Sequence, residues 1–153
     1  MARYLLDTNV LVYSLDGSDA AKQARALDVI ARVGAPGAAL AAPLGVLPAQ
    51  ALAEFSRVAL AKLKPPLSPD EAYAQVSLYE QVFPVLPLTA AVVREAIRGM
   101  RDHAFSYFDA QIWAAARLHQ VPVVLSEDFA AGSTVEGVSF VDPFAIDFDA
   151  ATL

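Results

Sequence analysis

Four acidic side chains stand where a folded chain could use them for chemistry. Asp7 follows a short apolar run near the start of the chain, and Asp128 follows a β-branched run. Asp109 opens a strongly apolar segment with helical spacing, and Glu54 is a lone acid in a long neutral stretch. Carboxylates that converge raise one another's pKa, so such a group is costly unless a cation neutralises it. Carboxylate and water ligands suit Mg²⁺ or Mn²⁺, and such ions can bind a phosphodiester, generate hydroxide and stabilise the leaving oxygen.

Each of these acids also has a purely structural interpretation. Aspartate is a good helix N-cap, and Asp7 stands at a strand-to-helix switch. Ser106 and Asp109 have the spacing of a capping box. Glu54 could face solvent and pair with Arg57, which lies on nearly the same face of a helix. A shared site is favoured because several acids arrive in similar settings.

Strand and helix patterns alternate along the chain. We expect a three-layer α/β/α sandwich with a mainly parallel central sheet of about five strands, because right-handed crossovers place helices on both faces of such a sheet. The expected strands cover residues 4–6, 38–42, 82–86, 121–125 and 138–141, and the expected helices cover residues 10–15, 20–33, 48–62, 69–81, 89–100 and 106–119. Pro84 indicates that the third strand lies at an edge. Ligands bind at the carboxyl ends of the strands in these sheets, where Asp7 and Asp128 would lie.

Composition and charge narrow the class of protein. The chain has 153 residues, of which 56% are hydrophobic, and we expect residues 1–153 to form a single domain. No apolar run approaches the roughly 20 residues that cross a bilayer, and no signal peptide is apparent. The absence of cysteine excludes disulfides and thiolate metal sites and fits an intracellular protein. The net charge of −6 argues against a broad surface for binding nucleic acid.

Four segments, taken in order and spacing, resemble the motifs of the PIN-domain ribonucleases, in particular the VapC-type toxins of prokaryotic toxin–antitoxin pairs. The segments are Leu5-Leu-Asp7-Thr-Asn9, Leu52-Ala-Glu54-Phe, Ser106-Tyr-Phe-Asp109-Ala and Leu125-Ser126-Glu-Asp128. Each motif alone is weak, but together they span nearly the whole chain.

The resemblance implies a fold, a chemistry and partners. Its acidic quartet, which would bind Mg²⁺ or Mn²⁺ and carry catalysis, is Asp7, Glu54, Asp109 and Asp128. Asn9 and Ser126 would support these acids or orient water. The resemblance also implies a PIN-like nuclease domain that cleaves RNA, forms a homodimer in the cytoplasm, and has a cognate antitoxin that covers the active site.

Other functions fit the sequence less well. A phosphatase whose nucleophilic Asp follows the first strand would need an acid at Asn9 and a late lysine, yet no lysine follows Lys64. The alternative that stays open is a catalytically inert PIN-like scaffold that acts as a binding module. For an active enzyme, Arg57 and Arg101 are the expected substrate contacts, because Arg57 follows Glu54 by three residues and Arg101 lies shortly before Asp109.

Overall fold

A mainly parallel sheet forms the centre of the protein, whose computed structural model describes residues 2–36, 42–129 and 131–153. Its strand order is β3-β2-β1-β4-β6-β5, and β5 is antiparallel to β6 while the other neighbouring pairs are parallel. The strands are β1 (Tyr4–Leu6), β2 (Gly45–Pro48), β3 (Val85–Leu86), β4 (Val123–Leu125), β5 (Thr134–Val135) and β6 (Val138–Val141). The expected α/β class with a mainly parallel sheet is confirmed, with six strands in place of about five.

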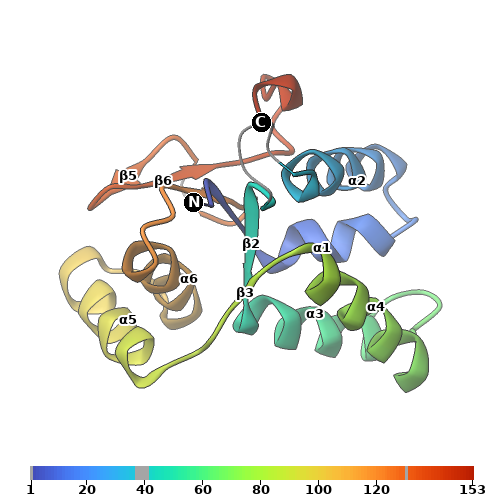
Figure 1. The fold of residues 1–153 in the computed structure, drawn as a ribbon, viewed down its shortest axis with the longest axis horizontal. Coiled ribbons are helices and arrows are strands. Elements are labelled where there is room, and N and C mark those ends of the chain that lie inside the picture. The colour runs from blue at the N-terminus through green and yellow to red at the C-terminus, as the bar shows by residue number, and fades with distance from the viewer. Residues whose placement is uncertain (1, 37–41, 130) are drawn as a thin grey trace.

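Helices cover both faces of this sheet (Figure 1). They are α1 (Thr8–Leu15), α2 (Ala20–Gly34), α3 (Ala49–Ala61), α4 (Pro69–Val82), α5 (Ala90–His103), α6 (Tyr107–Leu118) and the short 3₁₀ helix η1 (Ala150–Thr152). Side chains alternate across β1: Tyr4 and Leu6 join a core with α1 to α4, whereas Leu5 joins a second core with α5 and α6. Two hydrophobic cores on opposite faces therefore hold the sheet in a fixed position between the helices.

The strand beside β1 differs from the expected one. The strand predicted at residues 38–42 falls almost wholly outside the described residues. The strand β2 is formed by Gly45–Pro48, which follows that segment and includes the first residue of the expected helix 48–62. Gly45 is required there because a Cβ atom would lie 2.9 Å from both Phe83 and Val33. Glycine and proline, which are uncommon in strands, are thus accommodated in a short, buried strand.

Two other boundaries were predicted incorrectly. Helix α4 continues to Val82, with Phe83 as its C-cap, so β3 is limited to Val85–Leu86. This strand lies at the edge of the sheet, as Pro84 indicated. Helix α5 does not end at Met100 but reaches His103, so Arg101 belongs to its last turn and not to the following loop.

The β5–β6 hairpin was not expected from the sequence. Val135 and Val138 pair across a two-residue turn in which Glu136 and Gly137 have φ angles of 48° and 83°. Two positive φ angles are typical of a type I′ turn, which matches the twist of the flanking strands.

None of the helices in the described ranges is long and apolar enough to span a membrane.

Candidate active site

Asp7 is placed at the carboxyl end of β1, where it is also the N-cap of α1. Its Oδ1 accepts a hydrogen bond of 2.7 Å from the Thr8 backbone N–H, and its Oδ2 accepts one of 2.7 Å from the Ser126 hydroxyl. The side chain is buried, with 7% of its surface exposed. The strand register explains the contact between Asp7 and Ser126. Leu6 pairs with Leu125 in the parallel β1–β4 ladder, so the residues that follow them, Asp7 and Ser126, lie side by side. Capping and membership of a polar cluster therefore coexist at Asp7.

Ser126 links Asp7 to two further predicted site residues. Its Oγ accepts hydrogen bonds from Asn9 Nδ2 at 3.2 Å and from the Asp128 backbone N–H at 3.1 Å. Asn9 Nδ2 also donates to Asp128 Oδ2 at 3.1 Å. The structure thus joins Asp7, Asn9, Ser126 and Asp128 in one hydrogen-bonded cluster at the ends of β1 and β4.

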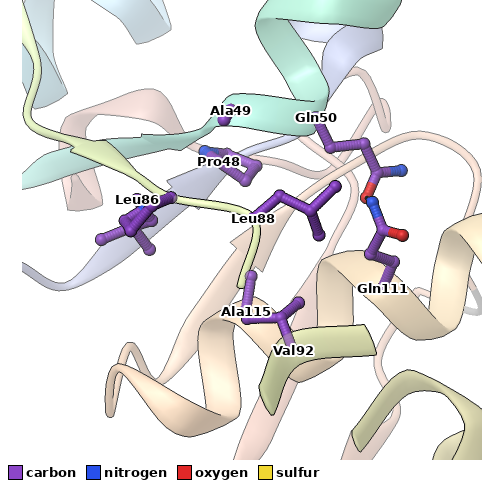
Figure 2. A pocket seen from close by; sticks show the side chains of 9 residues that line it. Pro48, Ala49, Gln50, Leu86, Leu88, Val92, Gln111 and Ala115 are labelled. Carbon is purple, nitrogen blue, oxygen red and sulfur yellow. Dashed lines mark hydrogen bonds between the residues drawn. The ribbon is translucent and has the colours of Figure 1, made fainter. Parts of the chain in front are cut away.

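Glu54 reaches the same region from α3. Its Oε1 accepts a 2.6 Å hydrogen bond from Gln50 Nε2, and its Oε2 lies 3.5 Å from the Thr8 hydroxyl. Among the described residues it forms no ion pair with Arg57, so the solvent-facing pair that we considered is not present. Glu54, Asn9 and Asp128 line a groove of about 410 Å³. Gln50 in turn faces Gln111 of α6 (Figure 2).

Asp109 lies in the first turn of α6, and its position differs from that of the other acids. Ser106 caps the helix by accepting a hydrogen bond of 3.4 Å from the Asp109 backbone N–H. The carboxylate does not complete the capping box and is not among the residues that line the groove. The preceding carbonyl, that of Phe108, accepts a hydrogen bond of 3.2 Å from Gln50 Nε2, which fastens this turn to α3.

The electrostatics of the cluster centre on Asp7. Burial raises its pKa to about 6; the hydrogen bonds from Ser126 and Thr8 oppose that rise, and the charges of Asp128 and Glu54 add to it. No three acidic or histidine side chains in the described ranges already stand in an arrangement that would hold a metal ion. The donor set nevertheless suits a hard cation, since it consists of carboxylates whose mutual repulsion a cation would relieve.

The amino-acid sequence matches a known family. The family model for the PIN domain matches residues 4–131. The chain belongs to the PIN-domain family. No curated protein sequence matches it. Among solved structures, similar folds are VapC20 of Mycobacterium tuberculosis, described as a sarcin–ricin loop cleaving toxin, a toxin–antitoxin complex from Klebsiella pneumoniae, and DNA-bound VapBC from Salmonella typhimurium.

These likenesses extend over nearly the full length of each structure. VapC20 is 21% identical to this PIN domain, with a TM-score of 0.64 and coverage of 87% of this chain and 97% of VapC20. The Klebsiella structure is 16% identical (TM-score 0.61; 92% of this chain and 97% of that one). The Salmonella structure is 16% identical (TM-score 0.63; 94% and 99%). At such identities the comparison establishes a shared fold.

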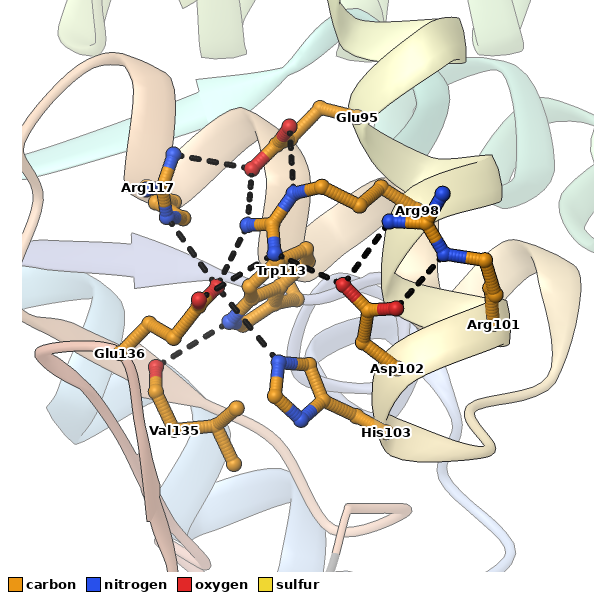
Figure 3. A network of polar contacts seen from close by, with 9 residues as sticks. All are labelled: Glu95, Arg98, Arg101, Asp102, His103, Trp113, Arg117, Val135 and Glu136. Carbon is orange, nitrogen blue, oxygen red and sulfur yellow. Dashed lines mark hydrogen bonds and ion pairs between the residues drawn. The ribbon is translucent and has the colours of Figure 1, made fainter.

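The two arginines predicted to contact substrate lie outside the groove of this PIN domain. Arg57 is exposed on α3, one turn beyond Glu54. Arg101 is also exposed, but it pairs with Asp102 at 2.7 Å, beside the ionic network of Arg98, Glu95 and Glu136 (Figure 3). Among the described residues Arg57 forms no ion pair, whereas Arg101 does. The role of both arginines in substrate binding remains a prediction.

Sequence reasoning overlooked several side chains that hold the candidate site together. Thr8 stands between two residues that we had selected, and Gln50 precedes Glu54 by four residues, a spacing at which helical side chains are neighbours. Glu127, which directly precedes Asp128, is only partly exposed, lines the groove and forms an ion pair with Lys22. The i, i+4 spacing could have identified Gln50, whereas the partner of Glu127 depends on the fold.

Asp7 makes stability depend on pH when metal is absent. Because its folded pKa is raised from 3.8 to about 6, the folded protein binds this proton more tightly than the unfolded chain does. Ionised Asp7 therefore costs about 3 kcal/mol at pH 7, roughly half as much at pH 5, and little below pH 4. We therefore expect Asp7→Asn to become more stable relative to the wild type as the pH rises from 5 to 7. The measurement is the free energy of unfolding of both proteins in urea, with EDTA present.

The asparagine forfeits one accepted hydrogen bond, worth about 1 kcal/mol, but that loss does not vary with pH. A stability difference between the two proteins that stays constant from pH 5 to pH 7 would contradict the raised pKa.

Proposed function

We propose that this PIN domain is a divalent-metal-dependent endoribonuclease that cleaves RNA phosphodiesters and acts as the toxin of a toxin–antitoxin pair. The observation that carries the proposal is the hydrogen-bonded cluster of Asp7, Asn9, Ser126 and Asp128 at the carboxyl edge of the sheet. Two of its members, Asn9 and Asp128, line a groove together with Glu54. A buried carboxylate with a raised pKa beside two other acids is an arrangement that a cation would stabilise.

The proposal gives each residue a role. Asp7, Glu54, Asp109 and Asp128 would hold Mg²⁺ or Mn²⁺, which supplies a hydroxide nucleophile and stabilises the leaving oxygen. Ser126 and Thr8 orient the Asp7 carboxylate by donating to separate oxygens, and Asn9 holds Asp128. Burial of Asp7 excludes water from one side of the carboxylate, which strengthens its interaction with any cation in the groove.

The proposed partners follow from the family and from the proteins that the similar structures contain. Toxin–antitoxin complexes are among them, and VapC20 is described as cleaving the sarcin–ricin loop. For this chain we propose RNA as substrate, a cognate antitoxin that covers the active site, a homodimer and a cytoplasmic location. An inert PIN-like scaffold is the rival function, and retention of all four acids favours the enzyme.

An acidic protein needs particular contacts to hold an acidic polymer. The net charge of −6 repels RNA, so the affinity should come from the bound cation and a few basic residues such as Arg57 and Arg101. Few phosphate contacts give a shallow salt dependence, with a slope of about −0.7 per contact for single strands. We expect RNA affinity, measured with cleavage-deficient Asp109→Asn against KCl concentration, to fall more on EDTA addition than on a moderate rise in salt.

Arg3 provides a matched control, because it is an exposed arginine directly before β1, at the opposite end of that strand from Asp7. Arg57→Ala should weaken binding and lower the salt slope by about 0.7, whereas Arg3→Ala should leave both unchanged. A steep salt slope that is indifferent to Mn²⁺ would place the RNA on another surface. Since Asp109→Asn can itself weaken metal binding, the series is repeated with wild-type protein and a non-cleavable 2′-O-methyl RNA.

A further inference from the structure

Two glutamines meet in the interior next to the candidate site. Gln50 lies in the first turn of α3 and Gln111 in α6, and both are buried, with 8% and 4% of their surfaces exposed. Figure 2 shows the ends of the two side chains turned toward each other beside an apolar pocket. Buried amides need hydrogen-bond partners, so their contacts determine how they are oriented.

The hydrogen bonds leave one consistent orientation for the Gln50 amide. Gln111 Nε2 donates to Gln50 Oε1 at 2.6 Å, which commits the Gln50 oxygen to α6. The Gln50 Nε2 group then donates to Glu54 Oε1 at 2.6 Å and to the Phe108 carbonyl at 3.2 Å. A flipped Gln50 amide would set its oxygen against the Glu54 carboxylate and its nitrogen against the Gln111 donor, so both contacts would become repulsive.

We infer that Gln50 and Gln111 are positioning residues that set the geometry of Glu54 and of the α6 turn that carries Asp109. This inference rests on the proposed function, in which both acids hold the metal ion. The single Gln50 nitrogen binds one oxygen of Glu54 and the carbonyl directly before Asp109, so it couples acids from two helices. Gln111 acts only through Gln50, because it fixes which end of that amide faces Glu54.

Neutral amides suit this task better than charged groups. A carboxylate at position 50 would add another like charge next to Glu54, and a lysine would neutralise Glu54 and compete with the cation. The pocket on the other side is lined by apolar residues including Leu88 and Val92, which also disfavour a charge. Partners that orient metal-binding side chains typically contribute 10–100-fold to metal affinity or activity.

The test compares Gln50→Met and Gln111→Met with the control Gln23→Met. In the wild type, the Gln23 amide donates to the Ser14 carbonyl at 3.3 Å and takes no part in the contacts of Gln50 and Gln111. Methionine keeps the approximate size and removes the amide. We expect each of the first two variants to bind Mn²⁺ about 10-fold more weakly by calorimetry and to cleave a fluorogenic single-stranded RNA with at least 10-fold lower kcat and little change in KM. Gln23→Met should keep the wild-type values.

Gln111→Met is the more informative variant, because Gln111 makes no hydrogen bond to Glu54 or Phe108 and is linked to Glu54 through the Gln50 amide. A fall in melting temperature with wild-type Mn²⁺ affinity and kcat would reduce the pair to a structural tie between α3 and α6 and overturn the inference. A wild-type protein that neither binds Mn²⁺ nor cleaves RNA would overturn the proposed function itself, and with it the role assigned to the glutamines.

Discussion

Asp7→Asn and Asp109→Asn should each abolish RNA cleavage while the protein keeps its fold. Asparagine has nearly the shape of aspartate but lacks the negative charge that the proposed metal site requires. Loss of metal-supplied stabilisation worth several kcal/mol corresponds to a fall in rate of about 10³-fold or more. The measurement is single-turnover cleavage of an RNA oligomer in Mg²⁺, with far-UV circular dichroism to verify the fold.

Asp28→Asn is the matched control, because Asp28 forms an exposed ion pair with Arg32 on α2. This variant should cleave RNA at the wild-type rate. The structural interpretation predicts the opposite pattern for the site variants. If Asp7→Asn and Asp109→Asn unfold where the wild type does not, the main role of these acids is structural and the catalytic assignment fails.

Trp113→Ala should cause the largest loss of stability among single changes in the second core. Trp113 is fully buried, its Nε1 donates to the Val135 carbonyl at 3.2 Å, and the guanidinium of Arg98 lies 5.3 Å from its ring centre (Figure 3). Truncation of a buried aromatic residue costs about 3–5 kcal/mol, a large part of the 5–15 kcal/mol by which a typical domain is stable.

The loss is measured by urea unfolding followed by circular dichroism, since Trp113 is the single tryptophan and its fluorescence disappears with it. Tyr73→Ala is the control, because 78% of that aromatic residue is exposed and its removal should change stability by no more than about 0.5 kcal/mol. A cost below 1 kcal/mol for Trp113→Ala would mean that the ionic network around it, and not the ring, holds the β5–β6 hairpin on α5 and α6.

Local sequence patterns were sufficient to predict an element where its burial agrees with the spacing of its apolar residues. The short apolar run before Asp7 predicted β1, and the apolar face after Ser106 predicted α6, because such runs have few alternative structures. Patterns failed where tertiary packing overrides composition. Gly45 and Pro48 suggest a loop, but their strand is stabilised by a parallel neighbour on each side, which no local signal reveals.

The candidate site divides in the same way. Asp7 and Asp128 could be predicted because each follows a strand whose carboxyl end lies at a shared edge, whereas Asn9 was predicted only from the resemblance to the PIN-domain family. Sequence alone did not place Asp109 relative to the groove. The link between Gln50 and Gln111 joins residues 61 positions apart, and it depends on how α3 packs against α6. Neither glutamine belongs to a motif, so only the folded structure identifies them.

Direct binding of Mn²⁺ to the metal-free protein tests the central claim most sharply, because it requires neither the natural RNA nor the antitoxin. Calorimetric titration should show Mn²⁺ binding to the wild type and to Asp28→Asn, and at least 10-fold weaker binding to Asp7→Asn and Asp128→Asn. Equal Mn²⁺ affinity in all four proteins, or none in the wild type, would contradict a metal-dependent nuclease site at these acids and would favour an inert PIN-like scaffold.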